Sequence, residues 1–554
     1  MRARLHERFQ SAVRELLAEA GSAAGPPDFS LEVPRNPEHG DFACNAALLL
    51  AKPLQRPPRQ IAERLIALLT AGEGVVARAE VAGPGFINVW LRDERWQDLL
   101  RSVLAQGRRY GRSQAGAGQQ VQVEFVSANP TGPLTLGHGR QAVLGDCIAR
   151  ALEAVGYRVT REYYFNNGGR QMRVLGESVR ARYLEQLGRP VEFPPDGYQG
   201  DYIAEIAADL VARDGDALTE EPGEGVFREV AEQQVFGEIR KTLDALGICF
   251  DVYSNEMALY QEGKLEETLA DLRMRDLVYE SEGAVWLRAT ALSLARDRVL
   301  IKGTGEPTYL LPDIAYHREK FRRGFDHIID VQGADHIEQF PFVRAAVGAL
   351  GCPVERLELV MNQFVTLTRG GEQVKQSKRR ATYVTVDELL GEVGPDVFRF
   401  FMVQRKAEGH LDFDLDLAKD TDWKKNPAYY VQYAHARSYG VERKAREQGI
   451  PTPVAGSVDA SLLALPEELE ILKKLGEFSD VVARAAEARE PHHLAYWVRE
   501  LAGLWNPYLQ DGVRHRVLSD DPALTSARLG LALAVRTVLA NALECLGISA
   551  PEQM

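Results

Sequence analysis

One short segment constrains the fold of this chain more than any other. A strand pattern, a turn rich in proline and glycine, and a helical pattern follow one another without interruption. Residues 121–126 alternate apolar and polar side chains, the Asn-Pro-Thr-Gly-Pro run at 129–133 cannot continue a strand, and apolar residues recur at helical spacing over 136–152. Free backbone N–H groups and the helix dipole favour an anion at such a helix start. The segment therefore predicts an anion site at the carboxyl end of a strand in an α/β sheet.

The patterning divides the 554 residues into three regions, within the range of about two to four domains expected for this length. Residues 1–112 are predicted to form an α+β domain. Over 118–420 strands and helices alternate, which predicts a doubly wound, parallel, Rossmann-like sheet with a mainly helical insertion at about 185–290. Residues 421–554 show only helical periodicity and are predicted to be an all-helical domain. Strands are expected at Val75–Val81, Phe86–Leu91, Arg158–Phe165, Ala284–Leu287, Val299–Ile301, His327–Val331 and Leu357–Met361.

Composition narrows the class of protein. No apolar run reaches the roughly 20 residues of a membrane-spanning helix, so we expect no membrane association. The five cysteines have no C-x-x-C spacing, which favours reduced thiols in a cytoplasmic protein and no metal site. The net charge of −13 argues weakly against nucleic-acid binding, but a basic face on an acidic protein can still bind RNA.

Several strings together resemble one enzyme family. Thr135-Leu136-Gly137-His138 resembles the HIGH motif of class I aminoacyl-tRNA synthetases, and Lys375-Gln376-Ser377-Lys378 resembles their KMSKS loop. The surrounding sequence is most similar to the arginyl-tRNA synthetase family. The resemblance implies an ATP-dependent ligase that forms arginyl-adenylate and transfers arginine to the 3′ end of its tRNA. The strings that carry it, in the family's order, are Gly40–Ala43, Ala82–Asn88, Asn426–Arg437 and Ala550–Met554.

The resemblance implies catalytic roles for Thr135, His138, Lys375 and Lys378. His138 lies in the first helical turn, where it can donate to a phosphate; alternatively it only caps or packs there. A side chain at the neighbouring glycines would push a nucleotide off the helix end. The two lysines would stabilise charge that develops on pyrophosphate, although a short basic run can be a solvated turn. The residues expected to bind ATP are Gly137, His138, Gly139, Gly333, Asp335, His336 and Ser377.

An arginine pocket must hold a planar, permanently charged guanidinium, which calls for carboxylates. By the resemblance, Asp313 pairs with the guanidinium and Tyr309 packs beside it. Asn129 and Glu124 bind the α-amino end or orient their neighbours. Taken singly, Asp313 could instead cap a helix and Tyr309 could be a core aromatic.

The C-terminal helices are expected to read the anticodon, because exposed aromatic rings stack unpaired bases. Tyr429 and Tyr433 share a helical face with Arg437 beside it, although each tyrosine could equally be a core residue. The N-terminal region resembles the family's additional domain on the outer corner of the tRNA. Mg²⁺ is expected to arrive with ATP without a dedicated protein site, and a monomer is expected.

Thr135 departs from the family, which usually has histidine there. A hydroxyl donates one hydrogen bond but carries no charge. This departure keeps a non-catalytic, synthetase-like RNA-binding or regulatory protein open as an alternative. A synthetase for another amino acid is a second alternative. An NAD-dependent oxidoreductase is disfavoured, because no G-x-G-x-x-G sequence follows a strand.

Overall fold

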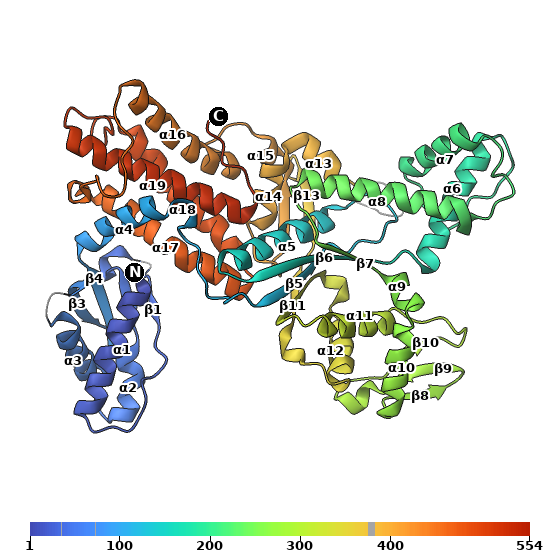
Figure 1. Ribbon diagram of the computed structural model, residues 1–554, viewed down its shortest axis with the longest axis horizontal. Helices are drawn as coiled ribbons and strands as arrows, with labels where there is room; N and C mark the ends of the chain where they lie inside the picture. Colours follow the sequence, from blue (N-terminus) through green and yellow to red (C-terminus); the bar gives the residue numbers. More distant parts are fainter. Residues whose placement is uncertain (35, 72–73, 375–382) are drawn as a thin grey trace. The chain divides into compact units, whose positions relative to one another are not determined.

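The computed structural model describes residues 1–34, 36–71, 74–374 and 383–554 (Figure 1). The chain forms two compact units, each built from separate stretches of sequence. The first combines Met1–Tyr110, Ser438–Glu477 and Gly503–Val538. The second combines Gly111–Arg437, Phe478–Ala502 and Leu539–Met554.

The N-terminal part of the first unit is an antiparallel sheet of order β1-β2-β4-β3 with helices packed against it. Both strands expected from the sequence are present, as β3 and β4. The two that were not expected are only two and three residues long, too short for a recognisable alternation. The elements are α1 (Arg2–Glu19), β1 (Leu31–Glu32), β2 (Phe42–Cys44), α2 (Ala46–Leu54), α3 (Pro58–Thr70), β3 (Val76–Ala82), β4 (Phe86–Leu91) and α4 (Asp93–Gln106).

The centre of the second unit is a five-stranded sheet in which every neighbouring pair is parallel. Its order, β12-β11-β5-β6-β7, reverses direction between β5 and β11, as in a Rossmann-type fold. The predicted α/β class is therefore confirmed. The strands are β5 (Gln120–Phe125), β6 (Arg158–Phe165), β7 (Val252–Asn255), β11 (His327–Gly333) and β12 (Leu357–Asn362).

The central strand and the helix after it are almost completely buried. Both faces of β5 are covered, since Val123 and the polar Gln122 are equally inaccessible. The following helix, α5 (Leu136–Ala154), packs so closely on β5 that a side chain at Gly145 would collide with the ring of Phe125. This contact fixes the middle of α5 against the last residue of β5.

Two strands expected in the parallel sheet belong elsewhere. Ala284–Leu287 is β9, and Val299–Ile301 lies within β10 (Arg298–Ile301); with β8 (Val278–Ser281) they form a separate antiparallel sheet. The hairpin between β8 and β9 turns through two residues of positive φ, Glu282 and Gly283. The prediction was wrong because strand patterns alone do not distinguish a hairpin from a parallel crossover.

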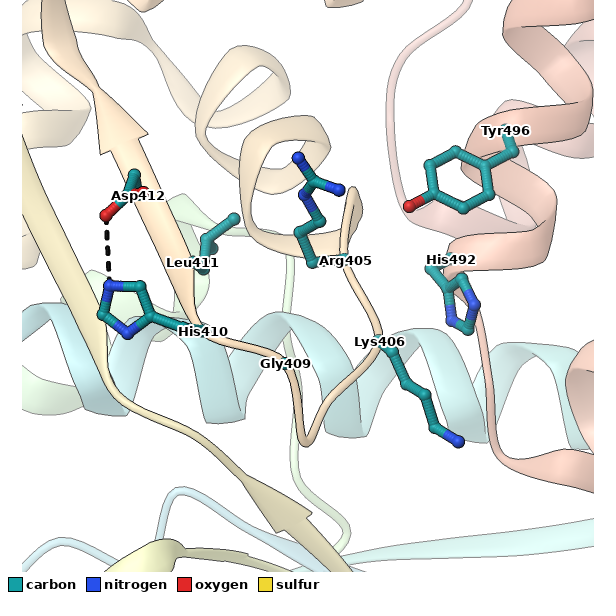
Figure 2. Close-up of a pocket in the computed structure, with 8 residues that line it drawn as sticks. All are labelled: Arg405, Lys406, Gly409, His410, Leu411, Asp412, His492 and Tyr496. Atoms are coloured by element: carbon teal, nitrogen blue, oxygen red, sulfur yellow. Dashed lines mark hydrogen bonds and ion pairs between the residues drawn. The ribbon is translucent and has the colours of Figure 1, made fainter.

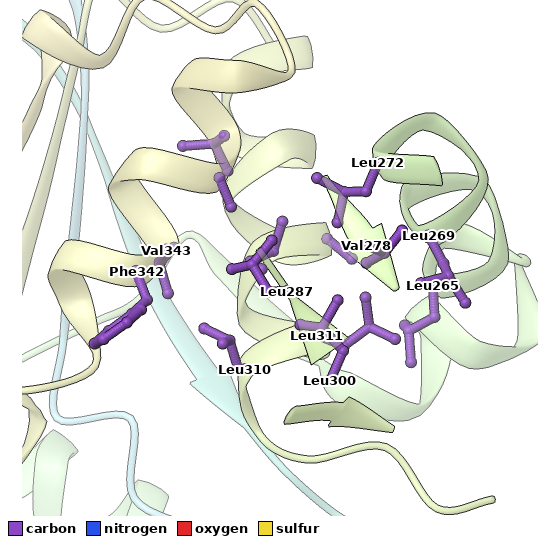
Figure 3. Close-up of a cluster of buried hydrophobic side chains, with 14 of the residues drawn as sticks. Leu265, Leu269, Leu272, Val278, Leu287, Leu300, Leu310, Leu311, Phe342 and Val343 are labelled. Atoms are coloured by element: carbon purple, nitrogen blue, oxygen red, sulfur yellow. The ribbon is translucent and has the colours of Figure 1, made fainter. Parts of the chain in front are cut away.

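This small sheet packs on α10 (Lys264–Met274), α11 (Leu310–Arg322) and α12 (Phe340–Ala349) around a core rich in leucine (Figure 3). Three helices precede this sheet in the sequence, and the first of them packs against both of the others (Figure 1). They are α6 (Gly169–Gln186), α7 (Asp201–Asp214) and α8 (Arg228–Ala245). Strand β7 follows α8 and returns to the main sheet, inside the range expected for the insertion.

The remaining elements are a small sheet and a series of helices. No strand occurs after Asp414, in a stretch that the structure describes throughout, as predicted. One helix, α19 (Pro522–Leu546), is long and apolar enough to cross a membrane, but 78% of its most apolar window is buried, as in the core helix of a globular protein. The elements are β13 (Val365–Arg369), β14 (Glu372–Gln373), α13 (Val386–Val393), α14 (Pro395–Val403), β15 (Leu411–Asp414), α15 (Leu415–Lys419), α16 (Pro427–Glu447), α17 (Pro466–Ala488), α18 (His492–Gln510) and α19 (Pro522–Leu546).

Candidate active site

A cavity of about 500 Å³ lies at the carboxyl ends of β5, β11 and β12, where the strand order reverses. The amide of Gln141 joins two of these strand ends, accepting from the N–H of Gly333 (2.7 Å) and donating to the carbonyl of Val126 (3.2 Å). The cavity is lined by Val126, Ser127, Thr135, Leu136, Gly137, His138, Gln141, Gly333, Ala334, His336, Asn362, Gln363, Phe364, Val365 and Tyr383.

Thr135 and His138 form a capping box at the start of α5. Nδ1 of His138 lies 3.3 Å from the backbone N–H of Thr135, from which it accepts a hydrogen bond, and 3.2 Å from the Thr135 hydroxyl. Because Nδ1 is an acceptor, a neutral His138 carries its proton on Nε2. His138 therefore caps the helix and also lines the cavity, so the two alternatives weighed from the sequence are compatible.

The two glycines beside His138 differ in their surroundings. A Cβ on Gly137 would meet only the Thr135 hydroxyl oxygen, at 3.9 Å. A Cβ on Gly139 would lie 2.7 Å from Cζ of Phe398 and 2.9 Å from Cγ2 of Val386, and Gly139 does not line the cavity. The reason given for Gly139 was therefore wrong: its small size is needed for helix packing.

The other predicted cavity residues follow β11. Gly333 and His336 line the cavity. Asp335 lies with His336 in a short helix, Ala334–His336, and the side chain of Asp335 is outside the described part of the structure. The predicted residues Lys375, Ser377 and Lys378 fall in 375–382, outside the described residues. Tyr383, which follows this stretch directly, lines the cavity.

Arg140 ties the start of α5 to two other segments. Its side chain is fully buried and donates to the carbonyls of Gln363, Gly409 and Lys406, each at 2.9 Å. Burial lowers the pKa of Arg140 to about 10. The helix that bears His138 is thereby held to the end of β12 and to the loop between α14 and β15.

Two carboxyl groups lie close to this cavity, Glu256 buried and Asp313 partly buried. Burial raises the pKa of Asp313 to about 6 and that of Glu256 to about 7, and each interacts unfavourably with a neighbouring carboxylate. Asp313 accepts from Gln339; Glu256 accepts from the Tyr164 hydroxyl (2.8 Å) and from Nδ2 of Asn166 (2.8 Å). Within the described chain, neither carboxyl has a lysine or arginine in ion-pair contact. The pair can therefore accept a cationic group from outside the protein.

Glu124, another predicted pocket residue, is already paired. Nζ of Lys320 donates to Glu124 and, at 2.6 Å, to Asp330, while the Ser127 hydroxyl donates to Glu124 at 2.8 Å. Burial opposes ionisation of Asp330, but Lys320 and His317 outweigh it and hold the pKa of Asp330 well below its usual range. Since Ser127 lines the cavity, this network connects Glu124 to the cavity wall.

Asn129 and Tyr309 lie on the loops around the two carboxyls. Asn129 accepts from the backbone N–H of Asn166 (3.1 Å) and donates to Gln171 (2.9 Å). Tyr309 directly precedes α11 and is 60% exposed, so it is not a core aromatic. Asp313 lies in the first turn of α11, of which Tyr309 is the N-cap residue.

Known families match the chain from end to end. Residues 4–91 match the arginyl tRNA synthetase N terminal domain, 99–397 the catalytic domain of class I (R) tRNA synthetases, and 431–554 the DALR anticodon binding domain. An arginine–tRNA ligase of Desulfotalea psychrophila is 48% identical over 96% of both chains, and one of Syntrophotalea carbinolica is 44% identical over 100% of both. The chain belongs to the arginyl-tRNA synthetase family. The solved arginyl-tRNA synthetase of Thermus thermophilus superposes with a TM-score of 0.76 over 100% of both chains, at 26% identity.

As a member of this family, the protein is an ATP-dependent arginine–tRNA ligase. Its substrates are arginine, ATP and the arginine-specific tRNA, and its C-terminal helices form a DALR anticodon-binding domain. The alternatives of a different amino acid, a non-catalytic relative and an oxidoreductase are thereby set aside, and the departure at Thr135 does not remove the chain from the family.

In this synthetase one predicted anticodon residue, Tyr433, packs against an aromatic side chain that the sequence analysis missed. Trp423 stacks on Tyr433 at a centroid distance of 4.0 Å, and the guanidinium of Arg437 lies 5.6 Å from the Tyr433 ring centre. Tyr429 and Tyr433 are both half-buried. One face of Tyr433 is therefore covered by Trp423.

Glu256 was also missed. It follows the strand Val252–Asn255, which was not predicted, so the rule that ligands bind at the carboxyl ends of strands did not point to it. The same rule applies to Asn362 and Gln363, which follow a strand that was predicted.

Proposed function

We propose that the cavity at the ends of β5, β11 and β12 binds ATP. Nε2–H of His138 and the Thr135 hydroxyl would donate to phosphate oxygens, and Gly137 allows close approach. On this proposal Lys375 and Lys378 stabilise charge on the departing pyrophosphate, and Mg²⁺ enters with ATP. Gly333, Asp335, His336 and Ser377 would complete the nucleotide site.

The arginine side chain would bind between Asp313 and Glu256. The observation that carries this assignment is a pair of carboxyls, one buried and one partly buried, whose pKa values are raised by burial and which form no ion pair with a lysine or arginine of the described chain. A guanidinium offers five donors in a plane and satisfies two carboxylates at once. Tyr309 would cover the side chain, and Asn129 with Glu124 would position the α-amino end.

In the tRNA complex, Tyr429, Tyr433 and Arg437 would contact the anticodon loop. With Trp423 against one face of Tyr433, a base would stack on the exposed parts of this cluster. We further propose functional domains at 1–112, 118–420 and 421–554, with the first on the outer corner of the tRNA. The enzyme would act as a cytoplasmic monomer.

Arginine-dependent pyrophosphate exchange in the presence of tRNA tests the pocket. Citrulline, which has the shape of arginine without its charge, is the matched probe. We expect activity with arginine and at least about a thousandfold weaker use of citrulline, because citrulline leaves the two carboxyls unpaired. Comparable use of both compounds would contradict a pocket built on Asp313 and Glu256.

A further inference from the structure

A second cavity, of about 360 Å³, lies on the second unit and shares no lining residue with the active-site cavity. It lies between the loop that joins α14 to β15 and the first two turns of α18 (Figure 2). Its walls are Arg405, Lys406, Gly409, His410, Leu411, Asp412, His492 and Tyr496.

Two groups in this cavity have unused hydrogen-bonding capacity. The exposed guanidinium of Arg405 makes no ion pair or hydrogen bond with any residue that the structure describes. The Tyr496 hydroxyl likewise has no bonding partner within the described chain, and its ring is 39% exposed. In Figure 2 this hydroxyl points from α18 toward Arg405. Both groups can donate to a ligand in the cavity.

The acidic groups near the cavity are already engaged. Asp412 accepts from His410 at 3.0 Å. Glu490 lies 2.8 Å from Nζ of Lys406 and 2.8 Å from Nε2 of His493. Arg405 is therefore the unpaired cation among the described residues that line the cavity, and the positive end of the α18 dipole adds to its charge; the carboxylate of Asp412, bonded to His410, also lines the cavity.

The neighbouring histidines do not make this a metal site. Ligand atoms of Glu490, His492 and His493 lie within 4.8 Å of one another, but the Lys406 ammonium already contacts the carboxylate and opposes a second cation. Burial lowers the pKa of His492 to about 4, so this imidazole is neutral near pH 7. Its ring instead supports Tyr496, with the two rings edge to face at 5.5 Å.

The cationic surface continues past Tyr496. This tyrosine also borders a cavity of about 520 Å³, whose other lining residues are three basic ones, one acidic one and two others: Lys424, Lys425, Arg499, Glu500, Pro427 and Tyr430. Lys425 pairs with Asp420, whereas Arg499 has no ion-pair partner in the described part of the chain. In a protein with a net charge of −13, basic and aromatic side chains concentrated in one place are the electrostatic pattern of a nucleic-acid contact.

We propose that the cavity beside Tyr496 binds a phosphate of the tRNA backbone, with Arg405 as its charged ligand and the Tyr496 hydroxyl as a second donor. The inference rests on the proposed function only in taking tRNA as the source of the phosphate. Arg405 suits this role because a guanidinium binds phosphate through two parallel hydrogen bonds.

The loop that carries Arg405 also connects this contact to the active site. Arg140 holds the carbonyls of Lys406 and Gly409 from inside, at 2.9 Å each. A phosphate bound on the outside of the loop therefore fixes tRNA to the segment that Arg140 ties to the helix bearing His138.

The test measures the affinity of full-length enzyme for its tRNA at several KCl concentrations. Each phosphate contact contributes about 0.9 to the slope of log K against log salt on a duplex and about 0.7 on a single strand. We expect Arg405→Gln to reduce the slope by about this amount and to weaken binding several-fold. Tyr496→Phe should weaken binding about two- to threefold and leave the slope unchanged. The matched control is Arg356→Gln, because Arg356 is exposed, lines none of these cavities and has no ion pair in the described chain.

If the salt dependence of tRNA binding by Arg405→Gln has the same slope as that of wild type, the proposal is wrong. It is also wrong if Arg356→Gln changes the slope as much as Arg405→Gln does. Inorganic phosphate distinguishes the source of the ligand: if Arg405→Gln abolishes phosphate binding and leaves tRNA binding intact, the cavity takes a free anion and the proposal is wrong. Ethylation of individual tRNA phosphates should identify one position at which the modification weakens tRNA binding by the wild-type enzyme but not by Arg405→Gln. Failure of wild type to charge tRNA would instead overturn the proposed function, since these slopes do not depend on turnover.

Discussion

Two groups of buried or partly buried carboxyls lie near the carboxyl edge of the main sheet, and their surroundings differ. Glu124 and Asp330 share the ammonium of Lys320, and the pKa of Asp330 is held below its usual range. Asp313 and Glu256 receive only neutral donors, and burial raises both pKa values. A buried charge that serves the fold is neutralised by the fold itself, whereas a pocket for a cation leaves its carboxyls for the ligand.

Removal of the internal cation should have the largest effect. Lys320→Met leaves two buried carboxylates without a partner, and we expect a loss of about 3–5 kcal/mol in the free energy of unfolding of the second unit, measured by denaturant titration. The control is Arg322→Gln on the same helix, which removes a solvent-accessible pair with Glu267 and should change stability little. Equal stability of the two variants would show that the paired cluster is not held by Lys320.

Removal of one ligand carboxylate should have a smaller and different effect. Asp313→Asn should reduce kcat/KM for arginine by about 30- to 1000-fold, equivalent to about 2–4 kcal/mol, because the guanidinium loses one of its charged partners. The free energy of unfolding should be unchanged or slightly raised, since the substitution removes a partly buried charge that has no lysine or arginine partner in the described chain. Glu256→Gln should behave alike. Unchanged arginine kinetics in both variants would contradict the pocket assignment.

The pH dependence separates the two clusters further. In the absence of arginine the folded-state pKa values of Asp313 and Glu256, about 6 and about 7, lie above their ordinary values. Their contribution to stability is therefore present at low pH and is lost as pH rises through 6 to 7. A bound guanidinium favours the ionised carboxyls, so arginine binding should release protons. The dissociation constant should fall as pH rises from 5.5 to 7, by up to about tenfold per pH unit for each of the two carboxyls.

Calorimetry of arginine binding in buffers of different ionisation enthalpy measures this proton release. Asp313→Asn and Glu256→Gln should each remove part of the proton release and make the dissociation constant for arginine less dependent on pH. A pH-independent affinity in wild type would show that both carboxyls are ionised before arginine binds.

The sequence predicted the parts of the site that lie close together in the chain. The path from β5 through the turn to α5 is visible because Pro130, Gly132 and the helical spacing after Leu136 act locally. Glu256 was invisible because its surroundings come from other strands and helices. Within its own segment, Ser-Asn-Glu is an ordinary helix start, and Asn255 does cap α9 (Glu256–Gln261).

The distinction between the paired and unpaired clusters could not be predicted either. Lys320 is fully buried, although a lysine in the helical pattern of α11 is expected to face solvent. Its partners, Glu124 and Asp330, become neighbours only when β5 and β11 pair. Parallel pairing joins segments about two hundred residues apart, and no local pattern records it.

The smallest effect is expected at Thr135, where a neutral group serves both fold and site. Its hydroxyl completes the capping box with His138, so Thr135→Val should cost about 0.5–2 kcal/mol of stability. The loss of one neutral hydrogen bond should raise the activation free energy of pyrophosphate exchange by about 0.5–1.5 kcal/mol. Thr135→Ser keeps the hydroxyl and should match wild type in both measurements.

His138→Ala should cost more activity than Thr135→Val, because it removes the imidazole donor together with half of the cap. If Thr135→Val loses more activity than His138→Ala, the threonine carries the phosphate contact and the roles proposed for the two residues must be exchanged.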